Sequence, residues 1–156
     1  MADEGAMFMA TLIANNSTLT SLDLSANHIA DDGAMSLGEA LVKNSTLVSL
    51  NVSWNRITDQ GLTGLAAGLR RGAGSLQKLN VHACKLGPKS GEEMIPTLMV
   101  ATSLTELSIH HNEILYQHNY VLESLVQNNA ERFNIRNIPL DQDTIRRLRG
   151  QVSPRL

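Results

Sequence analysis

The strongest constraint on the fold is a leucine-rich segment that recurs about every 28 residues. It runs from Leu19 to Ile29 as LTSLDLSANHI and returns from Leu47 as LVSLNVSWNRI. Further copies start at Leu76 (LQKLNVHACKL) and Leu104 (LTELSIHHNEI), so the starts are separated by 28, 29 and 28 residues. A period of this length predicts stacked supersecondary units, each of which buries its apolar side only against its neighbours.

Each copy changes its hydrophobic period part-way along. Leu22 and Leu24 alternate with polar residues, which is the period of two of a short strand with one face inward. Further on, apolar side chains are spaced by three and four residues, as at Ala34, Leu37 and Leu41, which is the pattern of an amphipathic helix. Asp31, Asp32 and Asp59 lie at the predicted helix starts, where we expect their carboxylates to cap free N–H groups.

A small polar residue follows each predicted strand, where the chain must turn away. An inward-pointing amide needs hydrogen-bond partners, which backbone groups of neighbouring units can supply. A cysteine at this place is a small, weakly polar substitute, so we interpret it as structural rather than reactive. The predicted structural ladder consists of Asn27, Asn55, Cys84 and Asn112.

The pattern resembles the leucine-rich repeat L-x-x-L-x-L-x-x-N/C-x-L/I, in the long, helix-bearing form typified by ribonuclease inhibitor. The resemblance implies an α/β fold, a right-handed horseshoe-shaped solenoid with parallel strands on the concave face and helices on the convex face. It also implies a protein-binding function on the concave face. The chain is more loosely similar in size to the C-terminal repeat domain of tropomodulin, a compact array closed by a helix.

The repeat phase predicts a single domain over residues 1–156 with modified ends. Residues 1–18 match the second half of a repeat, because DEGAM from Asp3 matches DDGAM from Asp31 at a shift of 28. This first helix carries no obvious cap, so either a longer array precedes it or another domain or subunit covers it. The other predicted units are the repeats 19–46, 47–75, 76–103 and 104–129 and a degenerate C-terminal capping repeat over 130–156.

Composition argues against several function classes. Fifteen acidic and 13 basic residues give a formal charge of −2, so we expect neither a nucleic-acid partner nor binding to an anionic membrane. No run of residues is long and apolar enough to span a bilayer. One cysteine excludes an internal disulfide, and the start Met-Ala-Asp-Glu lacks the basic and apolar regions of a secretory signal. We therefore expect a cytoplasmic protein.

Strand positions that do not point inward should face the concave surface, where they vary without damaging the core. They are polar and only mildly charged. Trp54 is the sole tryptophan and either anchors a partner or shields the ladder beside it. The predicted partner-binding residues are Asp23, Asn51, Ser53, Trp54, Lys78, Asn80, His82, Glu106, His110, His111, Arg132 and Arg136.

Nothing in the pattern predicts a metal, a cofactor or catalysis. His82 and His110 occupy the same place on neighbouring repeats, so their Cβ atoms should lie ~5 Å apart. A zinc site usually has three or four protein ligands, and no further ligand converges here, so we expect these histidines to contact a partner instead. The nucleophile elbow, the phosphate-binding loop and the H-E-x-x-H motif are all absent.

Three function classes follow. The first is a non-catalytic module that binds a protein through the concave face. The second is a structural or assembly element, or a fragment of a larger receptor or actin-regulator-like protein, in which the helix around Met7, Met9 and Leu12 packs edge-on against another domain or a second copy. The third is a GTPase-activator-type repeat protein. The only residues that favour this class are Asn55 and Arg56, which lie on a predicted loop edge where such contacts could form.

Overall fold

A computed structural model of the chain describes residues 1–72, 74–90, 94, 97, 101, 103–109 and 111–113. Strands and helices alternate along this part of the chain. The described elements are α1 (Asp3–Asn15), β1 (Ser21–Asp23), α2 (Asp31–Lys43), β2 (Ser49–Asn51), α3 (Asp59–Arg71), β3 (Lys78–Asn80) and β4 (Glu106–Ser108). The predicted capping repeat over 130–156 lies outside the described residues.

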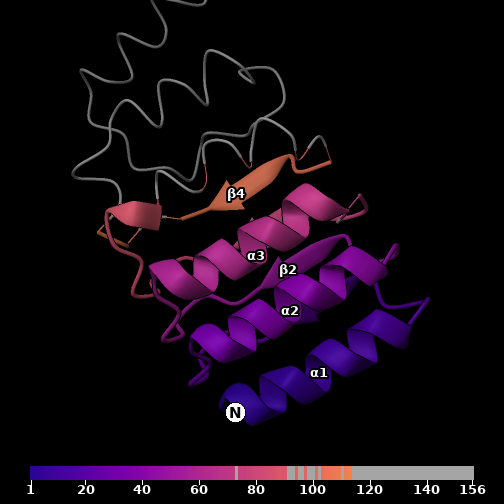
Figure 1. Ribbon diagram of the computed structural model, residues 1–156, viewed down its shortest axis with the longest axis horizontal. Coiled ribbons are helices and arrows are strands. Elements are labelled where there is room, and N and C mark those ends of the chain that lie inside the picture. Colours follow the sequence, from indigo (N-terminus) through magenta and orange to yellow (C-terminus); the bar gives the residue numbers. More distant parts are fainter. Residues whose placement is uncertain are drawn as a thin grey trace, which may run out of the picture.

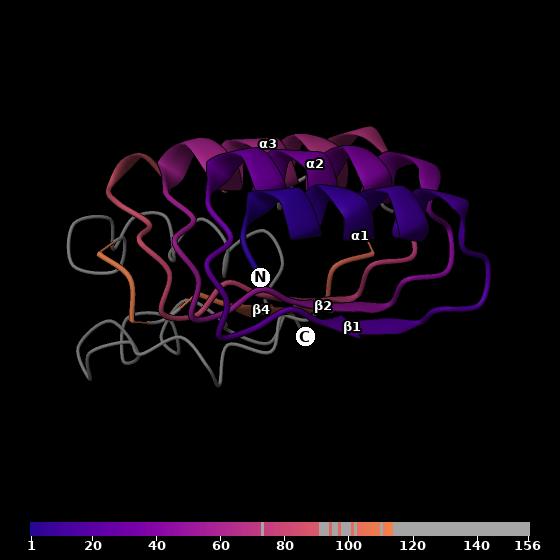
Figure 2. The ribbon, with the colours of Figure 1, turned by 90° about the horizontal axis from the view of Figure 1, so that it is seen from below.

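The four strands form one parallel sheet in the order β1-β2-β3-β4, which is also their order in the chain. Leu22, Leu50, Leu79 and Leu107 are paired in register across it, so each repeat lies directly against the next. Helices α1, α2 and α3 lie side by side in a second layer (Figure 1), and the edge-on view separates the helix layer from the strand layer (Figure 2). The predicted α/β solenoid, with strands on one face and helices on the other, is confirmed.

The hydrophobic core fills the space between the two layers. Leu50 and Leu79 from the strands are 1% and 2% exposed, and Leu37 and Leu65 from the helices are fully buried. Burying such a leucine contributes about 1.5–3 kcal/mol. Leu22 is only half-buried, because β1 lies at the edge of the sheet.

Glycines let α2 and α3 pack backbone against backbone. A Cβ atom on Gly38 would overlap the Gly64 carbonyl oxygen, and one on Gly68 would overlap the carbonyl oxygen of Gly38. The equivalent places between α1 and α2 hold Ala10, Ser36 and Ala40, and a groove of about 410 Å³ opens there. Among the described residues, no helix has the length and apolar character required to cross a bilayer.

We predict that Gly68→Ala destabilises the protein even though alanine is the better helix former by ~1 kcal/mol. Inserting a methyl group between the two backbones should cost about 1–3 kcal/mol, measured as the free energy of unfolding in urea. Gly74→Ala is the matched control, because a Cβ atom there would have only the Gly72 carbonyl oxygen near it, at 3.8 Å. A gain in stability from Gly68→Ala would contradict the close approach of the helices.

Candidate functional site

The turn after each strand is held by a buried side chain that bridges two repeats. Asn55 is 6% exposed, and its Nδ2 donates to the carbonyl oxygens of Leu24 and Val52, both at 2.9 Å. Its Oδ1 accepts from the Ile29 backbone N–H at 2.9 Å. Asn112 repeats this arrangement two ladder places further on, with partners Val81, Ile109 and Leu86.

The other two ladder residues show how the pattern adapts. Asn27 donates to backbone carbonyls of its own repeat, and its Oδ1 accepts from the N-terminal ammonium group of Met1 at 2.7 Å. The Cys84 thiol donates to the Val52 carbonyl oxygen at 3.5 Å. Burial raises the pKa of this thiol, and backbone hydrogen bonds from Asn55 and Ile57 oppose the shift more weakly. These contacts place Cys84 in a structural position.

Aspartates at the helix starts form a second ladder on the same turns. The Oδ1 atom of Asp31, the first residue of α2, accepts from the backbone N–H groups of Thr58 and Gly61, at 2.8 and 2.9 Å. Capping by Asp31 and Asp59 was predicted, and each of them caps the start of the following repeat. No capping bond is found for the Asp32 carboxylate among the described residues. Equivalent bonds join Asp3 to Ala30 and Gly33, and Asp59 to Gly87 and Ser90.

The concave face is a shallow groove of about 320 Å³, floored by β1 to β4. Asp23 lies at one end, where its Oδ1 accepts from the Ser25 N–H at 2.8 Å and its Oδ2 from the Asn51 amide at 3.0 Å. Hydrogen bonds from the Ser25 hydroxyl and backbone N–H, and to a lesser degree from Asn51, hold the pKa of Asp23 below its ordinary value despite some desolvation. Asp23 is therefore ionised at neutral pH.

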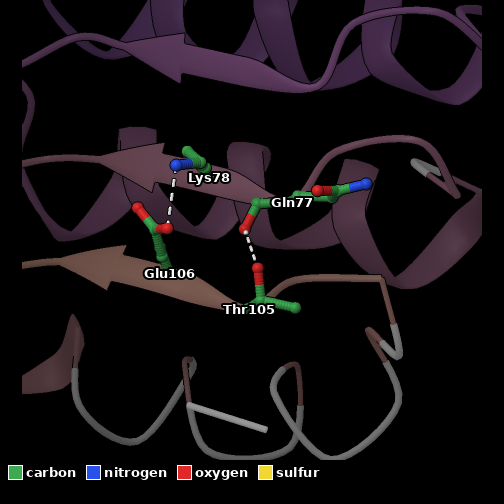
Figure 3. Close-up of polar contacts among 4 residues, drawn as sticks. All are labelled: Gln77, Lys78, Thr105 and Glu106. Atoms are coloured by element: carbon green, nitrogen blue, oxygen red, sulfur yellow. Dashed lines mark hydrogen bonds and ion pairs between the residues drawn. The ribbon is translucent and has the colours of Figure 1, made fainter. Parts of the chain in front are cut away.

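An ion pair occupies the other end of the groove. Lys78 on β3 and Glu106 on β4 are opposite each other in the sheet, and their side chains meet at 2.8 Å (Figure 3). Beside them, the Thr105 hydroxyl donates to the Gln77 carbonyl oxygen at 3.3 Å, which ties the strand starts together. Because both charged side chains are about half exposed, the pair contributes ~0–1 kcal/mol to stability.

Trp54, His82 and His111 lie beyond the groove, in the turns that follow the strands. The Trp54 and His82 rings meet edge to face at 5.5 Å between centroids, and His82 packs on His111 at 4.8 Å. Trp54 and His111 have left-handed backbone φ angles of 56° and 55°, and Ala26 and Ala83 share this conformation in their repeats. The predicted single binding face is therefore two surfaces, a strand groove and a row of rings in the turns.

One predicted contact residue is buried. Ser53 is only 4% exposed, and its carbonyl oxygen accepts from the Ala26 N–H and from the Asn55 amide. Ser53 therefore belongs to the structural turn, and its assignment to the binding surface was wrong. Asn51, Asn80, Lys78, Glu106 and Asp23 line the groove. Their contact with a partner stays a prediction.

Three predicted site residues, His110, Arg132 and Arg136, lie outside the described residues. The proposed proximity of His82 and His110 is therefore left as a prediction. Within the described part of the chain, no cluster of three or more His, Cys, Asp or Glu side chains is placed to hold a metal ion.

Comparisons with known proteins agree with this architecture. A family model described as a leucine-rich repeat matches residues 15–38 and 43–66. These two segments are therefore leucine-rich repeats. Among solved structures it is similar to Leiomodin-1 Actin-Binding Site 2, with a TM-score of 0.75 and 20% identity over 97% of this chain and 81% of that one. No curated protein matches the sequence. At this identity the likeness concerns the fold, and it agrees with the looser similarity to the tropomodulin group.

We predict that Asp31→Ala lowers the free energy of unfolding by about 1–2 kcal/mol, because the start of α3 loses the hydrogen bonds from the preceding repeat and keeps only its own Thr58 cap. Asp32→Ala is the matched control, since Asp32 is exposed and its carboxylate bonds to no described residue. Urea unfolding followed by circular dichroism measures both. Equal losses in the two variants would show that general helix-end charge, rather than the inter-repeat cap, supplies the stability.

The Cys84 thiol should make stability depend on pH. Because burial raises its folded pKa, the native state is favoured below the unfolded pKa of ~8.5, and this advantage is lost as pH rises through the folded value. Urea unfolding from about pH 8 to about pH 10 should therefore show the native chain losing stability relative to Cys84→Ala. A constant difference between the two proteins over this range would contradict the prediction.

Proposed function

We propose that this chain is a non-catalytic protein-interaction module of the cytoplasm, and that its concave groove contacts a protein partner. The observation that carries the proposal is the register of the strands. It aligns polar side chains from successive repeats on one continuous surface, whose floor is fixed by backbone hydrogen bonds. A rigid polar floor binds at a low entropic cost, because few of its groups need to be ordered.

The groove has a defined polarity. Asp23 has no basic partner among the described residues, so it presents an uncompensated negative charge at the β1 end. The Lys78–Glu106 pair supplies one charge of each sign at the far end. A partner segment that crosses the groove would place a basic group over Asp23 and polar groups over the pair, since complementary charges fix orientation and register.

The similarity to Leiomodin-1 Actin-Binding Site 2 makes actin the first partner to test. At 20% identity this choice rests on the fold alone. Co-sedimentation with actin filaments and binding to monomeric actin therefore form one arm of the experiment, and capture from cell lysate forms the other.

A charge-swapped variant tests whether the groove binds. Lys78→Glu combined with Glu106→Lys keeps the ion pair and the net charge but reverses the local polarity, so the partner should be lost while circular dichroism is unchanged. The matched control swaps Glu39 and Lys43, two exposed residues four apart on the convex helix α2. Retention of the partner by the groove swap, or its loss in both swaps, would contradict concave binding.

A second candidate is an assembly role for the first helix, because α1 carries unpartnered apolar side chains. Phe8 and Leu12 are 65% and 47% exposed, and Met1 and Met7 are 41% and 40% exposed. In α2 the places of Phe8 and Leu12 hold Ser36 and Ala40, small residues beside α1. The outer edge of α1 therefore offers larger apolar groups than an internal helix of the array does.

If this edge packs against a second copy, light scattering across a concentration series should show a dimer that Phe8→Ser with Leu12→Ser converts to a monomer. The variant should remain folded, because both side chains are exposed in the isolated chain. A monomer at all concentrations for the native chain would rule out self-assembly through α1.

A further inference from the structure

The turns after the strands carry a row of exposed basic residues next to the aromatic rings. Arg56 and Lys85 directly follow the ladder residues Asn55 and Cys84, and both are exposed. Backbone hydrogen bonds join each of these turns to the turn of the preceding repeat. The Arg56 N–H donates to the Ile29 carbonyl oxygen at 2.7 Å, and the Lys85 N–H donates to the Ile57 carbonyl oxygen at 2.8 Å. The two cations therefore project from adjacent turns on the same edge of the solenoid. We call Trp54, Arg56, His82, Lys85 and His111 the loop edge.

The positive charge on the loop edge is not balanced by described side chains. Arg56 and Lys85 form no ion pair with any described residue. Among the described residues, this row runs from His28 to Glu113. Glu113 is exposed, is the one acid in the described row and forms no ion pair with Lys85. Two acids at the helix starts, Asp31 and Asp59, accept hydrogen bonds from backbone N–H groups of the following repeats. Like charges on adjacent turns repel, so their placement does not serve stability.

The aromatic side chains of the loop edge support one another. Trp54 is 62% exposed, yet its ring is supported edge to face by His82, which in turn packs on His111. A large ring that already packs on a neighbour loses less conformational freedom on binding than an unsupported one. Tryptophan and arginine are also the residue types most enriched among interface hot spots.

We propose that the loop edge binds an acidic, extended segment of a partner protein. An apolar or aromatic side chain of that segment would lie on Trp54, and carboxylates on either side would pair with Arg56 and Lys85. The site steps by ~5 Å from one turn to the next, while an extended chain places same-side residues ~6.6–7 Å apart, which flexible Arg and Lys side chains can follow. Trp54, Arg56 and Lys85 do not line the concave groove, so this surface is independent of the one proposed above.

A peptide fits this surface better than a nucleic acid does. The positive edge belongs to a chain whose formal charge is −2, and exposed acids such as Asp32 and Glu39 lie on the helices. A polyanion gains from a broad basic surface, whereas two cations beside a tryptophan suit a short segment of mixed acidic and apolar character.

The intrinsic fluorescence of Trp54 reports directly on the loop edge, because it is the only tryptophan in the chain. The probe is a short peptide that alternates Glu with Leu, and its control is the same peptide with Gln in place of Glu. The Glu peptide should shift the Trp54 emission and the Gln peptide should bind at least about tenfold more weakly. Equal binding of the two, or no binding of either, would overturn the proposal.

Two variants separate local from general charge effects. Arg56→Glu should weaken the Glu peptide about tenfold, whereas Lys43→Glu, an equal charge change at the end of α2, should not. The Lys78/Glu106 charge swap should leave peptide binding unchanged, which keeps this result distinct from any failure of groove binding. Equal losses in Arg56→Glu and Lys43→Glu, or tighter binding of a single-stranded oligonucleotide than of the peptide, would contradict an acidic protein segment as the ligand.

Discussion

The satisfaction of buried backbone groups by the neighbouring repeat is the interaction on which this structure depends. The turn around Asn55 removes carbonyl and N–H groups from water, and its side-chain amide supplies partners to groups of two repeats at once. A buried polar group without a partner costs about 1–3 kcal/mol, so a single repeat in isolation would have several such costs. The aspartates at the helix starts extend this dependence to the other layer, because Asp31 of α2 adds to the cap that Thr58 gives α3. Stability is therefore a property of adjacent pairs of repeats.

The curvature of the array follows from a mismatch between its two layers. Parallel strands lie ~4.8 Å apart, whereas packed helices need ~8–10 Å between their axes. Each repeat contributes one strand and one helix, so the wider helix spacing can be met only if the helices lie along an outer arc. The strands then lie on the concave side. Gly38, Gly64 and Gly68 reduce the helix spacing where α2 meets α3. The alanines and serine between α1 and α2 reduce it less, and a groove remains. Residue size along the helix face thus sets the local bend of the floor that would meet a partner.

Sequence periodicity predicted the strands, the helices and the ladder, because each depends on a pattern that recurs within one repeat. The sequence predicted that Asp31 caps a helix but not which one. A linear pattern cannot distinguish an aspartate that caps its own helix from an aspartate that caps the helix of the next repeat. The sequence also could not predict the burial of Ser53 or the contact of His82 with Trp54 and His111. Both result from the left-handed conformation at the residue before the ladder position, which turns the chain after strict strand alternation has ended. A tryptophan such as Trp54 in that conformation is not expected from propensity, and it persists because backbone bonds between the repeats fix the turn.

The groove and the loop edge are separate surfaces, but they share the same turns. The Asn80 side chain lines the groove, and its Oδ1 accepts from the backbone N–H of His82 at 2.9 Å. The ring of His82 in turn supports Trp54. A partner group that competes for the Asn80 amide would therefore act on the turn that positions the aromatic row. Because the ladder residue Cys84 and its neighbours hold the rest of that turn through contacts of their own, such a change would stay local and leave the stacking of the repeats intact. The division between a rigid ladder inside and adjustable polar side chains outside is what allows a repeat array to vary its surface without losing its fold.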